Sequence, residues 1–316
     1  MIEGSISKGI GPLFILLEIA KKHWIIYNKR MEGQKMGNIK LLALDMDGTL
    51  FNSQGEISKK DRETLKRATE AGVAVAVATG RAYTELPIEM LYEIGVHYAI
   101  TGNGSGVYRL PNQECVLSDC LDNEVVYDIL DEVGQLDVYY DVYIEGLVYC
   151  PKSVCHNIRK MDMPTAIHEH VERTRIVVDD LIEFIKESGK QVEKATVNFA
   201  LLEDGTLLGR AETAEILDRY SQVQYLCGGY HNWEFTRAGV TKGTGIKFLA
   251  EKLGISMDET MACGDSQNDL SMLEVVHAAV AMENATEEVK KVCNFISKSN
   301  NESGVAYAVE KLIFGE

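Results

Sequence analysis

The sequence predicts an α/β protein with a parallel-sheet core and an inserted α+β domain. Three observations lead to this prediction. Short apolar runs alternate with helical segments in the first third of the chain, the alternation returns in the last third, and strands rich in aromatic residues lie between. Leu41–Leu44 is apolar throughout and too short for a helix, which is typical of a strand buried on both faces of a parallel sheet. Strand–helix–strand alternation implies right-handed crossovers.

The elements of the core are predicted from apolar runs and helix caps. Ser58 has the side chain of an N-cap residue, with Asp61 in the following turn and with Leu65 and Ala68 on one helix face. We expect strands at 41–44, 73–78, 96–100, 260–263, 278–282 and 295–297, and helices at 58–71, 83–94, 241–253 and 268–276.

Near residue 118 the pattern changes to that of the inserted domain. Residues 136–150 alternate, with many aromatic and β-branched side chains, which indicates exposed antiparallel strands. Further expected elements are helices at 123–133 and 213–220 and strands at 190–202 and 205–208. We assign two aromatic groups to packing rather than to binding: Trp233-Glu234-Phe235, and the tyrosines at 139, 140 and 143.

Three parts of the chain follow from this pattern. Residues 1–37 form an N-terminal extension, residues 38–117 and 229–316 form the core, and residues 118–228 form the inserted domain. A chain of 316 residues with 46% hydrophobic residues is long enough for two domains with a sizeable core.

The first 35 residues differ from the rest. The segment 10–27 is apolar-rich but carries Glu18 and Lys21, which makes it too polar for a membrane span of about 20 apolar residues. It also lacks the basic start and the cleavage site of a signal peptide. We favour Met31 or Met36 as the true start, and the alternative is an amphipathic helix for docking or membrane contact.

Charge and cysteine content limit the partners and the compartment. A net charge of −16 argues against nucleic acid or an anionic membrane surface as the main partner. The seven cysteines are an odd number without a C-x-x-C pair, which favours reduced thiols in a cytoplasmic protein. Cys150, Cys155 and His156 lack the second ligand pair that would support zinc. We expect a monomer or a small homo-oligomer that binds a small molecule.

Two carboxylates follow the first strand. Asp45 and Asp47 are two residues apart, so on an extended chain both point the same way and can serve one reacting group. The carboxyl end of a parallel strand is where open α/β sheets bind ligands. Like charges this close repel one another, and a divalent cation relieves the repulsion. Gly48 lets the backbone turn sharply after them.

Four ordered motifs carry a resemblance to a known family. Asp45-Met46-Asp47-Gly48-Thr49-Leu50 resembles the first signature of the haloacid dehalogenase-like hydrolase superfamily in its phosphatase form. Thr79-Gly80-Arg81, the Lys242 segment 239–243 and the segment 264–272 resemble the others. The resemblance covers roughly residues 38–316 and is to the Cof-type branch. It implies a Rossmann-like core with an inserted α+β cap domain between the second and third signatures.

The chemistry of phosphoryl transfer assigns roles to both aspartates. The reaction needs a nucleophile, neutralisation of the phosphoryl oxygens and a proton for the leaving oxygen. Asp45 is the expected nucleophile, whose carboxylate attacks phosphorus to form an aspartyl-phosphate. Asp47 is the expected general acid, which protonates the leaving alkoxide and then takes a proton from water. Burial beside other carboxylates would favour its protonated form.

The remaining site residues are expected from strand ends and from the resemblance. Asp45, a backbone oxygen of Asp47 and Asp265 are the expected Mg²⁺ ligands, because that ion prefers hard oxygen ligands. Arg81 and Asn103 are candidates for phosphate or substrate contact, with a surface arginine and a turn asparagine as the alternatives. The expected phosphate-binding residues are Met46, Thr79, Gly80 and Lys242. The resemblance implies that Asn268 also reaches the phosphate and that Asp269 supports Lys242 or the metal shell.

The predicted function is a Mg²⁺-dependent phosphatase of small phosphorylated metabolites, sugar phosphates or related cofactors. The alternatives are a phosphomutase and a binding or regulatory protein without turnover. Asp47 disfavours a carbon–halogen hydrolase, because that reaction protonates no alkoxide. An ion-pumping ATPase is excluded because the sequence has no transmembrane helices.

Overall fold

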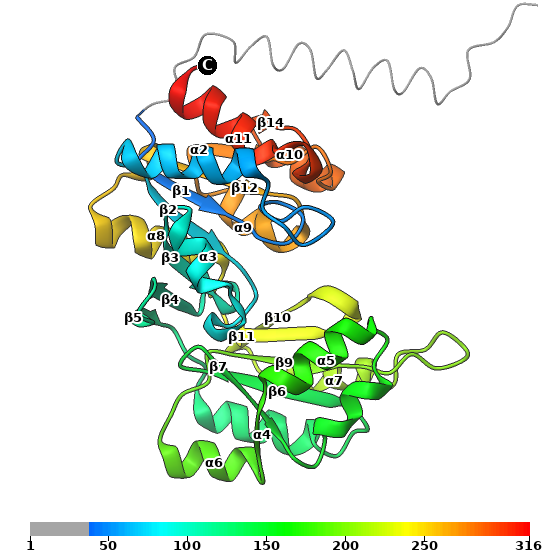
Figure 1. Cartoon of the computed structure of the whole chain (residues 1–316). Helices are drawn as coiled ribbons and strands as arrows, with labels where there is room; N and C mark the ends of the chain where they lie inside the picture. Colours follow the sequence, from blue (N-terminus) through cyan, green and yellow to red (C-terminus); the bar gives the residue numbers. More distant parts are fainter. Residues whose placement is uncertain (1–37) are drawn as a thin grey trace, which may run out of the picture. The chain divides into compact units, whose positions relative to one another are not determined.

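The computed structural model describes residues 38–316, and the predictions made for residues 1–37 lie outside this range. Two sheets organise the described chain (Figure 1). None of the helices in the described range is long and apolar enough to span a bilayer. The predicted fold class, an α/β core with a parallel-rich sheet, is confirmed.

The first sheet has eight strands in the order β14-β13-β12-β1-β2-β3-β4-β5. The strands from β14 to β3 are parallel, and β4 and β5 add an antiparallel hairpin at one edge. Chain order reverses between β1 and β12, which are direct neighbours. The strands are β1 Leu41–Leu44, β2 Ala74–Ala78, β3 Val96–Thr101, β4 Gly106–Arg109, β5 Glu114–Ser118, β12 Thr260–Gly264, β13 Ala278–Ala281 and β14 Phe295–Ile296.

Helices cover both faces of this sheet, as its apolar strands require. Leu41 and Ala43 point to the face covered by α8, α9 and α10, while Leu42 and Leu44 point to the other and are also fully buried. α2 packs against β2 and α11 (Figure 1). The helices are α2 Lys59–Glu70, α3 Ile88–Glu93, α8 Lys242–Leu253, α9 Leu270–Leu273, α10 Glu287–Val292 and α11 Gly304–Val309.

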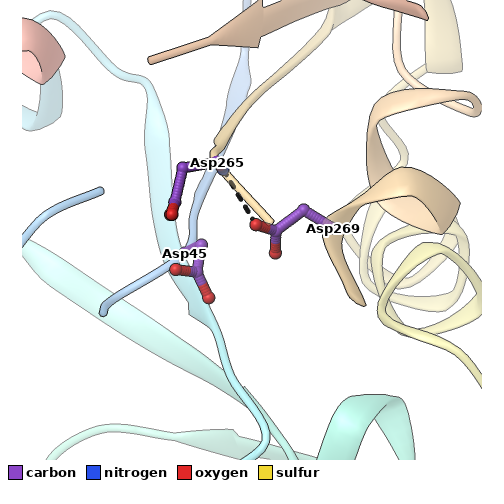
Figure 2. Close-up of side chains that lie close together, drawn as sticks. All are labelled: Asp45, Asp265 and Asp269. Atoms are coloured by element: carbon purple, nitrogen blue, oxygen red, sulfur yellow. Dashed lines mark hydrogen bonds between the residues drawn. The ribbon is translucent and has the colours of Figure 1, made fainter. Parts of the chain in front are cut away.

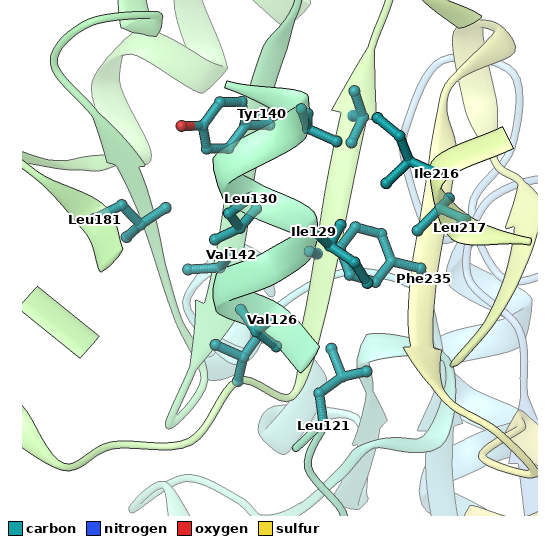
Figure 3. Packing of buried hydrophobic residues seen from close by; sticks show 14 of the residues in the cluster. Leu121, Val126, Ile129, Leu130, Tyr140, Val142, Leu181, Ile216, Leu217 and Phe235 are labelled. Atoms are coloured by element: carbon teal, nitrogen blue, oxygen red, sulfur yellow. The ribbon is translucent and has the colours of Figure 1, made fainter. Parts of the chain in front are cut away.

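The second sheet has six strands in the order β10-β11-β9-β6-β7-β8. One of its faces carries an apolar core closed by helices, in which Val126 and Ile129 of α4 pack over Val142 and Phe235 (Figure 3). The elements are β6 Tyr139–Ile144, β7 Leu147–Pro151, β8 Ile176–Val178, β9 Lys194–Asn198, β10 Val223–Cys227, β11 Trp233–Arg237, α4 Asn123–Val133, α5 Thr165–Thr174, α6 Leu181–Ser188 and α7 Arg210–Leu217.

Several predicted elements are confirmed and others are corrected. Ser58 caps α2 by accepting from Asp61 N, as expected. The single helix predicted at 83–94 is wrong, because Pro87 divides it into a 3₁₀ turn at Tyr83–Glu85 and α3. The strand predicted at 205–208 is reduced to an isolated bridge between Leu201 and Leu207.

The exposed strands predicted at 136–150 are also corrected, since every residue of β6 is buried. One face of β6 packs on the apolar core of the second sheet, and on the other face Tyr143 Oη donates at 3.4 Å to Oε2 of Glu85, which lies in the segment after β2. The second sheet also runs past the boundary predicted at 228. β11 pairs with β10 and β9, and it ends at Arg237.

Candidate active site

Two neighbouring strands deliver the first pair of carboxylates. β1 and β12 are paired where the chain order of the sheet reverses, and Asp45 and Asp265 directly follow them. Asp45 N extends the ladder by donating to Cys263 O at 3.0 Å. Ligands of open α/β sheets bind at this edge. The structure therefore brings both aspartates to the place that the sequence predicted for them.

Lys242 is the buried cation of the site. It begins α8, whose N-cap Thr241 accepts a hydrogen bond from Thr244 N. The Lys242 side chain is 1% exposed, and its Nζ donates to Asp45 Oδ1 at 2.6 Å and to Asp269 Oδ1 at 2.7 Å. The contact predicted between Asp269 and Lys242 is thus formed.

The loop after β12 is held by its own carboxylate. Asp269 Oδ2 accepts from the backbone N–H groups of Asp265 at 2.9 Å and Ser266 at 3.0 Å (Figure 2 shows the first of these bonds). Thr49 Oγ1 donates to Asp265 Oδ1 at 2.8 Å. Gly48 has a φ of +86°, and a Cβ there would lie 2.5 Å from Asp265 Oδ2. Only glycine lets the first motif pass this close to Asp265.

Burial and crowding shift the pKa values of this cluster. Burial raises the pKa of Asp45 well above its ordinary value, and Asp269 adds to the rise while Lys242 opposes it. Burial likewise raises the pKa of Asp265 to about 6. Burial by itself lowers the pKa of Lys242, but Asp269 and Asp45 outweigh that effect and raise it. Lys242 is therefore charged, and the carboxylates around it need further positive charge.

The acidic cluster fits a hard divalent cation. Carboxylate oxygens of Asp45, Asp265 and Asp269 lie within 4.8 Å of one another (Figure 2). Both oxygens of Asp269 already accept hydrogen bonds, whereas Oδ2 of Asp45 and Oδ2 of Asp265 accept none within residues 38–316. The donor set available to a metal is therefore Asp45 and Asp265, as predicted, because Asp269 is committed to Lys242 and the loop.

Asp47 differs from its predicted surroundings. Its side chain is 62% exposed, so the burial expected for it is wrong. Arg81 binds it with both ends of the guanidinium: Nε lies 3.0 Å from Oδ2 and Nη2 lies 2.6 Å from Oδ1. These two hydrogen bonds hold Arg81 against Asp47, whereas the alternative expectation was a surface arginine without a partner in the site.

Gly80 is enclosed by three polar side chains, of which sequence reasoning proposed only Asn103. Lys194 Nζ donates to Gly80 O at 2.7 Å and lies 2.8 Å from Glu234 Oε2. Asn103 Nδ2 donates to the same Glu234 oxygen at 2.7 Å. The sequence pattern predicts packing for Glu234 and does not single out Lys194. The available signal was a lysine at the start of an otherwise uncharged strand.

Three expected phosphate-binding residues lie on the loops around this edge. Met46 directly follows Asp45, and its side chain is fully buried, so only its backbone can reach a ligand. Thr79 directly follows β2 and its Oγ1 accepts from Arg81 N at 3.2 Å. Asn268 follows Asp265 in the same loop and its Oδ1 accepts from Ser266 Oγ at 2.6 Å. Their phosphate roles stay predictions.

Known proteins resemble this chain in sequence. A family model described as haloacid dehalogenase-like hydrolase matches residues 42–309. Phosphatase YwpJ of Bacillus subtilis (strain 168) is 28% identical over 296 residues, which span 87% of this chain and 100% of that protein. The 5-amino-6-(5-phospho-D-ribitylamino)uracil phosphatase YwtE of the same organism is 31% identical over 296 residues, spanning 88% and 99%.

Solved structures agree in fold. A haloacid dehalogenase-like hydrolase from B. subtilis superposes with a TM-score of 0.71 at 24% identity, covering 87% of this chain and 99% of that chain. TM0651 from Thermotoga maritima gives a TM-score of 0.68 at 26% identity, covering 86% and 97%. With the family match, the two relatives and the paired strand ends in agreement, this chain belongs to the haloacid dehalogenase-like hydrolase family, in its Cof-type phosphatase branch.

Proposed function

We propose that this phosphatase is Mg²⁺-dependent and hydrolyses small phosphorylated metabolites through an aspartyl-phosphate on Asp45. The observation that carries the proposal is the buried Lys242 side chain, which bridges Asp45 and Asp269. Asp265 lies beside this bridge, and Asp47 follows Asp45 by two residues in the sequence. A carboxylate fixed by a cation at a ligand-binding sheet edge is suited to nucleophilic attack on phosphorus.

The chain's own residues provide for both halves of the reaction. In the first, a carboxylate oxygen of Asp45 bonds to phosphorus, the bond to the leaving oxygen breaks, and that oxygen takes a proton from Asp47. In the second, Asp47 takes a proton from water, the water oxygen bonds to phosphorus, and the Asp45–phosphorus bond breaks. Lys242 keeps Asp45 in one rotamer through the 2.6 Å bond.

Arg81 links substrate binding to the hydrogen bonds of Asp47. The guanidinium is paired with both Asp47 oxygens. A substrate phosphate at Thr79 and Gly80 competes for the same guanidinium. Transfer of Arg81 to the phosphate would free both Asp47 oxygens to face the leaving oxygen of the substrate.

Mg²⁺ would be held by Asp45 and Asp265, with the backbone oxygen of Asp47 as the expected third protein ligand. When bound, it supplies the positive charge that offsets these carboxylates and the phosphate oxygens. Thr49 keeps Asp265 oriented through its hydrogen bond to Oδ1, so that Oδ2 remains available.

Sugar phosphates or related cofactors are the substrate class that we propose. Three of the relatives, YwtE, YcsE and YitU of B. subtilis, are named 5-amino-6-(5-phospho-D-ribitylamino)uracil phosphatases, and the substrate in that name carries its phosphate on a ribityl chain. We further place the enzyme in the cytoplasm, as a monomer or small homo-oligomer. Hydrolysis is distinguished from a phosphomutase reaction by free phosphate, which only hydrolysis releases.

Removal of the metal is expected to stop phosphate release. In a screen of phosphorylated metabolites, EDTA should abolish activity and Mg²⁺ should restore it. Asp265→Asn should raise the Mg²⁺ concentration needed for half-maximal activity by at least about 100-fold. Mutating a residue that only hydrogen-bonds to a metal ligand already lowers metal affinity or activity about 10–100-fold, and loss of a ligand itself should cost more. Asp258→Asn, an exposed aspartate that precedes β12 at the opposite end of that strand, serves as the control. Full activity in chelator would contradict the proposed metal.

Asp47→Asn tests the general acid. An alkyl phosphate expels a basic alkoxide that needs a proton, whereas p-nitrophenyl phosphate expels a stable anion that hardly does. General acid catalysis contributes about 10²–10⁴-fold. We therefore expect that loss on alkyl phosphates and a distinctly smaller one on the nitrophenyl ester, measured as kcat/KM. Equal losses on both substrates would mean that Asp47 acts through structure or metal placement alone.

A further inference from the structure

The turn that follows Asp47 combines a close approach with a flexible residue. Gly48 has a φ of +86°, and a Cβ there would lie 2.5 Å from Asp265 Oδ2, so only glycine fits. Glycine also has the widest choice of backbone conformations, so its presence does not fix the turn by itself. The backbone oxygen of Asp47, an expected Mg²⁺ ligand, belongs to the peptide that joins Asp47 to Gly48. Another group must therefore hold this peptide in place.

An asparagine from the last third of the chain holds the turn. Asn284 lies in the loop after β13, 236 residues from Gly48 in the sequence, and its Nδ2 donates to Gly48 O at 2.8 Å. Its Oδ1 accepts from Asn300 N at 3.0 Å. The carbonyl of Gly48 and the N–H of Asn300 need opposite ends of the amide, so the Asn284 side chain has one orientation.

The loop that carries Asn284 is also bonded to the segment that carries Asp265. Thr286 N donates to Asp265 O at 3.0 Å, and this bond is separate from the one that Thr49 makes to the Asp265 side chain. The same short loop thus contacts the backbone of both segments that supply expected Mg²⁺ ligands. Asn284 therefore ties the Gly48 turn to the backbone of Asp265.

A second asparagine anchors the first. Asn300 is only 9% exposed, whereas Asn284 is exposed. Asn300 Nδ2 donates to Phe51 O at 2.9 Å, three residues beyond Gly48 in the same turn. The two asparagines, which we call the asparagine clip, therefore hold the turn at Gly48 and at Phe51. Anchoring by a buried neighbour reduces the side-chain freedom that an exposed asparagine would otherwise lose when it binds Gly48.

We propose that Asn284 is a positioning residue for the Mg²⁺ site, which uses the asparagine clip to hold the Asp47–Gly48 peptide beside Asp265. The inference rests on the proposed function, because it takes Mg²⁺ as the ion. Mg²⁺ demands near-ideal octahedral geometry and short metal–oxygen distances, whereas Ca²⁺ accepts oxygen ligands in a flexible arrangement. A turn that has lost Asn284 should therefore bind Mg²⁺ much more weakly and Ca²⁺ only slightly more weakly.

Asn284→Ala is the test, with the Kd of Mg²⁺ and of Ca²⁺ measured by titration calorimetry on the full chain without substrate. Residues that orient metal ligands are worth about 10–100-fold in metal affinity, so we expect the Mg²⁺ Kd to rise about tenfold. The Ca²⁺ Kd should rise distinctly less. The melting temperature without metal should stay nearly unchanged, because Asn284 is exposed. At saturating Mg²⁺ the kcat should return close to that of the unmutated protein.

Asn301→Ala is the matched control. Asn301 is an exposed neighbour of Asn300, and its Oδ1 accepts from Ser53 N at 3.0 Å, beyond the turn that the clip holds. Its removal deletes a similar hydrogen bond from the same region and should change neither Kd. Equal rises of the Mg²⁺ and Ca²⁺ Kd in Asn284→Ala, or no rise, would overturn the positioning role. An equal rise in Asn301→Ala would overturn it as well.

A failure of the proposed function looks different. The unmutated protein would then bind Mg²⁺ but release no phosphate from any phosphomonoester. Because calorimetry needs no turnover, a rise of the Mg²⁺ Kd that is selective over Ca²⁺ in Asn284→Ala would still support the positioning role in that case. If the unmutated protein binds no Mg²⁺, the proposed metal is wrong and the positioning role is overturned with it.

Discussion

Asp45→Asn is expected to abolish turnover while the protein stays folded. An amide oxygen cannot form the acyl-phosphate, so the two-step route through Asp45 is lost. Loss of a nucleophile costs on the order of 10⁴–10⁶-fold in kcat. Phosphate release from the best substrate of the screen measures the effect, with Asp258→Asn as the control.

The fold should tolerate this change. Asparagine has the volume of aspartate, and Lys242 keeps its ion pair with Asp269. Burial already disfavours the Asp45 carboxylate, as its raised pKa shows, so removing that charge relieves part of the cost. We expect a melting temperature close to that of the unmutated protein. Activity within tenfold of the unmutated enzyme would rule out Asp45 as the nucleophile.

Lys242→Met is expected to damage both stability and activity. The change removes the only cation that contacts Asp45 and Asp269 among residues 38–316 and leaves two buried carboxylates facing each other. Breaking a buried ion pair in this way costs about 3–5 kcal/mol. Urea unfolding measures the loss, and phosphate release should fall together with it.

Two further variants separate charge from volume. Lys247→Met changes the same residue type at an exposed position of α8 and should leave stability nearly unchanged. Lys242→Arg keeps the charge but places a larger group where the lysine is 1% exposed, so an intermediate loss is expected. Added Mg²⁺ should partly stabilise Lys242→Met, because it supplies positive charge to the same carboxylates. If Lys242→Met unfolds at the same urea concentration as the unmutated protein, the hydrogen bonds of Lys242 to Asp45 and Asp269 do not stabilise the fold.

The features that could be predicted from the sequence depend on local physics. Leu41–Leu44 is a buried strand because all its side chains are apolar, and α2 begins where Ser58 can cap it. Asp45 and Asp265 were placed correctly because each directly follows such a strand, and the ends of parallel strands share an edge. Pro87 is also a local signal, because it separates the 3₁₀ turn at Tyr83–Glu85 from α3 where the apolar pattern alone predicts one helix.

The remaining features were decided by tertiary structure. Asp47 is exposed and paired with Arg81, 34 residues away, which no local pattern of either segment specifies. β11 belongs to the second sheet because it pairs with β9 and β10, so Glu234 lies beside Gly80 rather than in a packing cluster. Lys194 likewise reaches Gly80 because its strand, β9, pairs with β11 in the second sheet. Strand propensity fixes that a segment is extended, whereas register and sheet membership depend on partners far along the chain. The sequence thus determined that Asp45 and Asp265 lie at one edge of the parallel sheet, and the tertiary structure determined which side chains surround them.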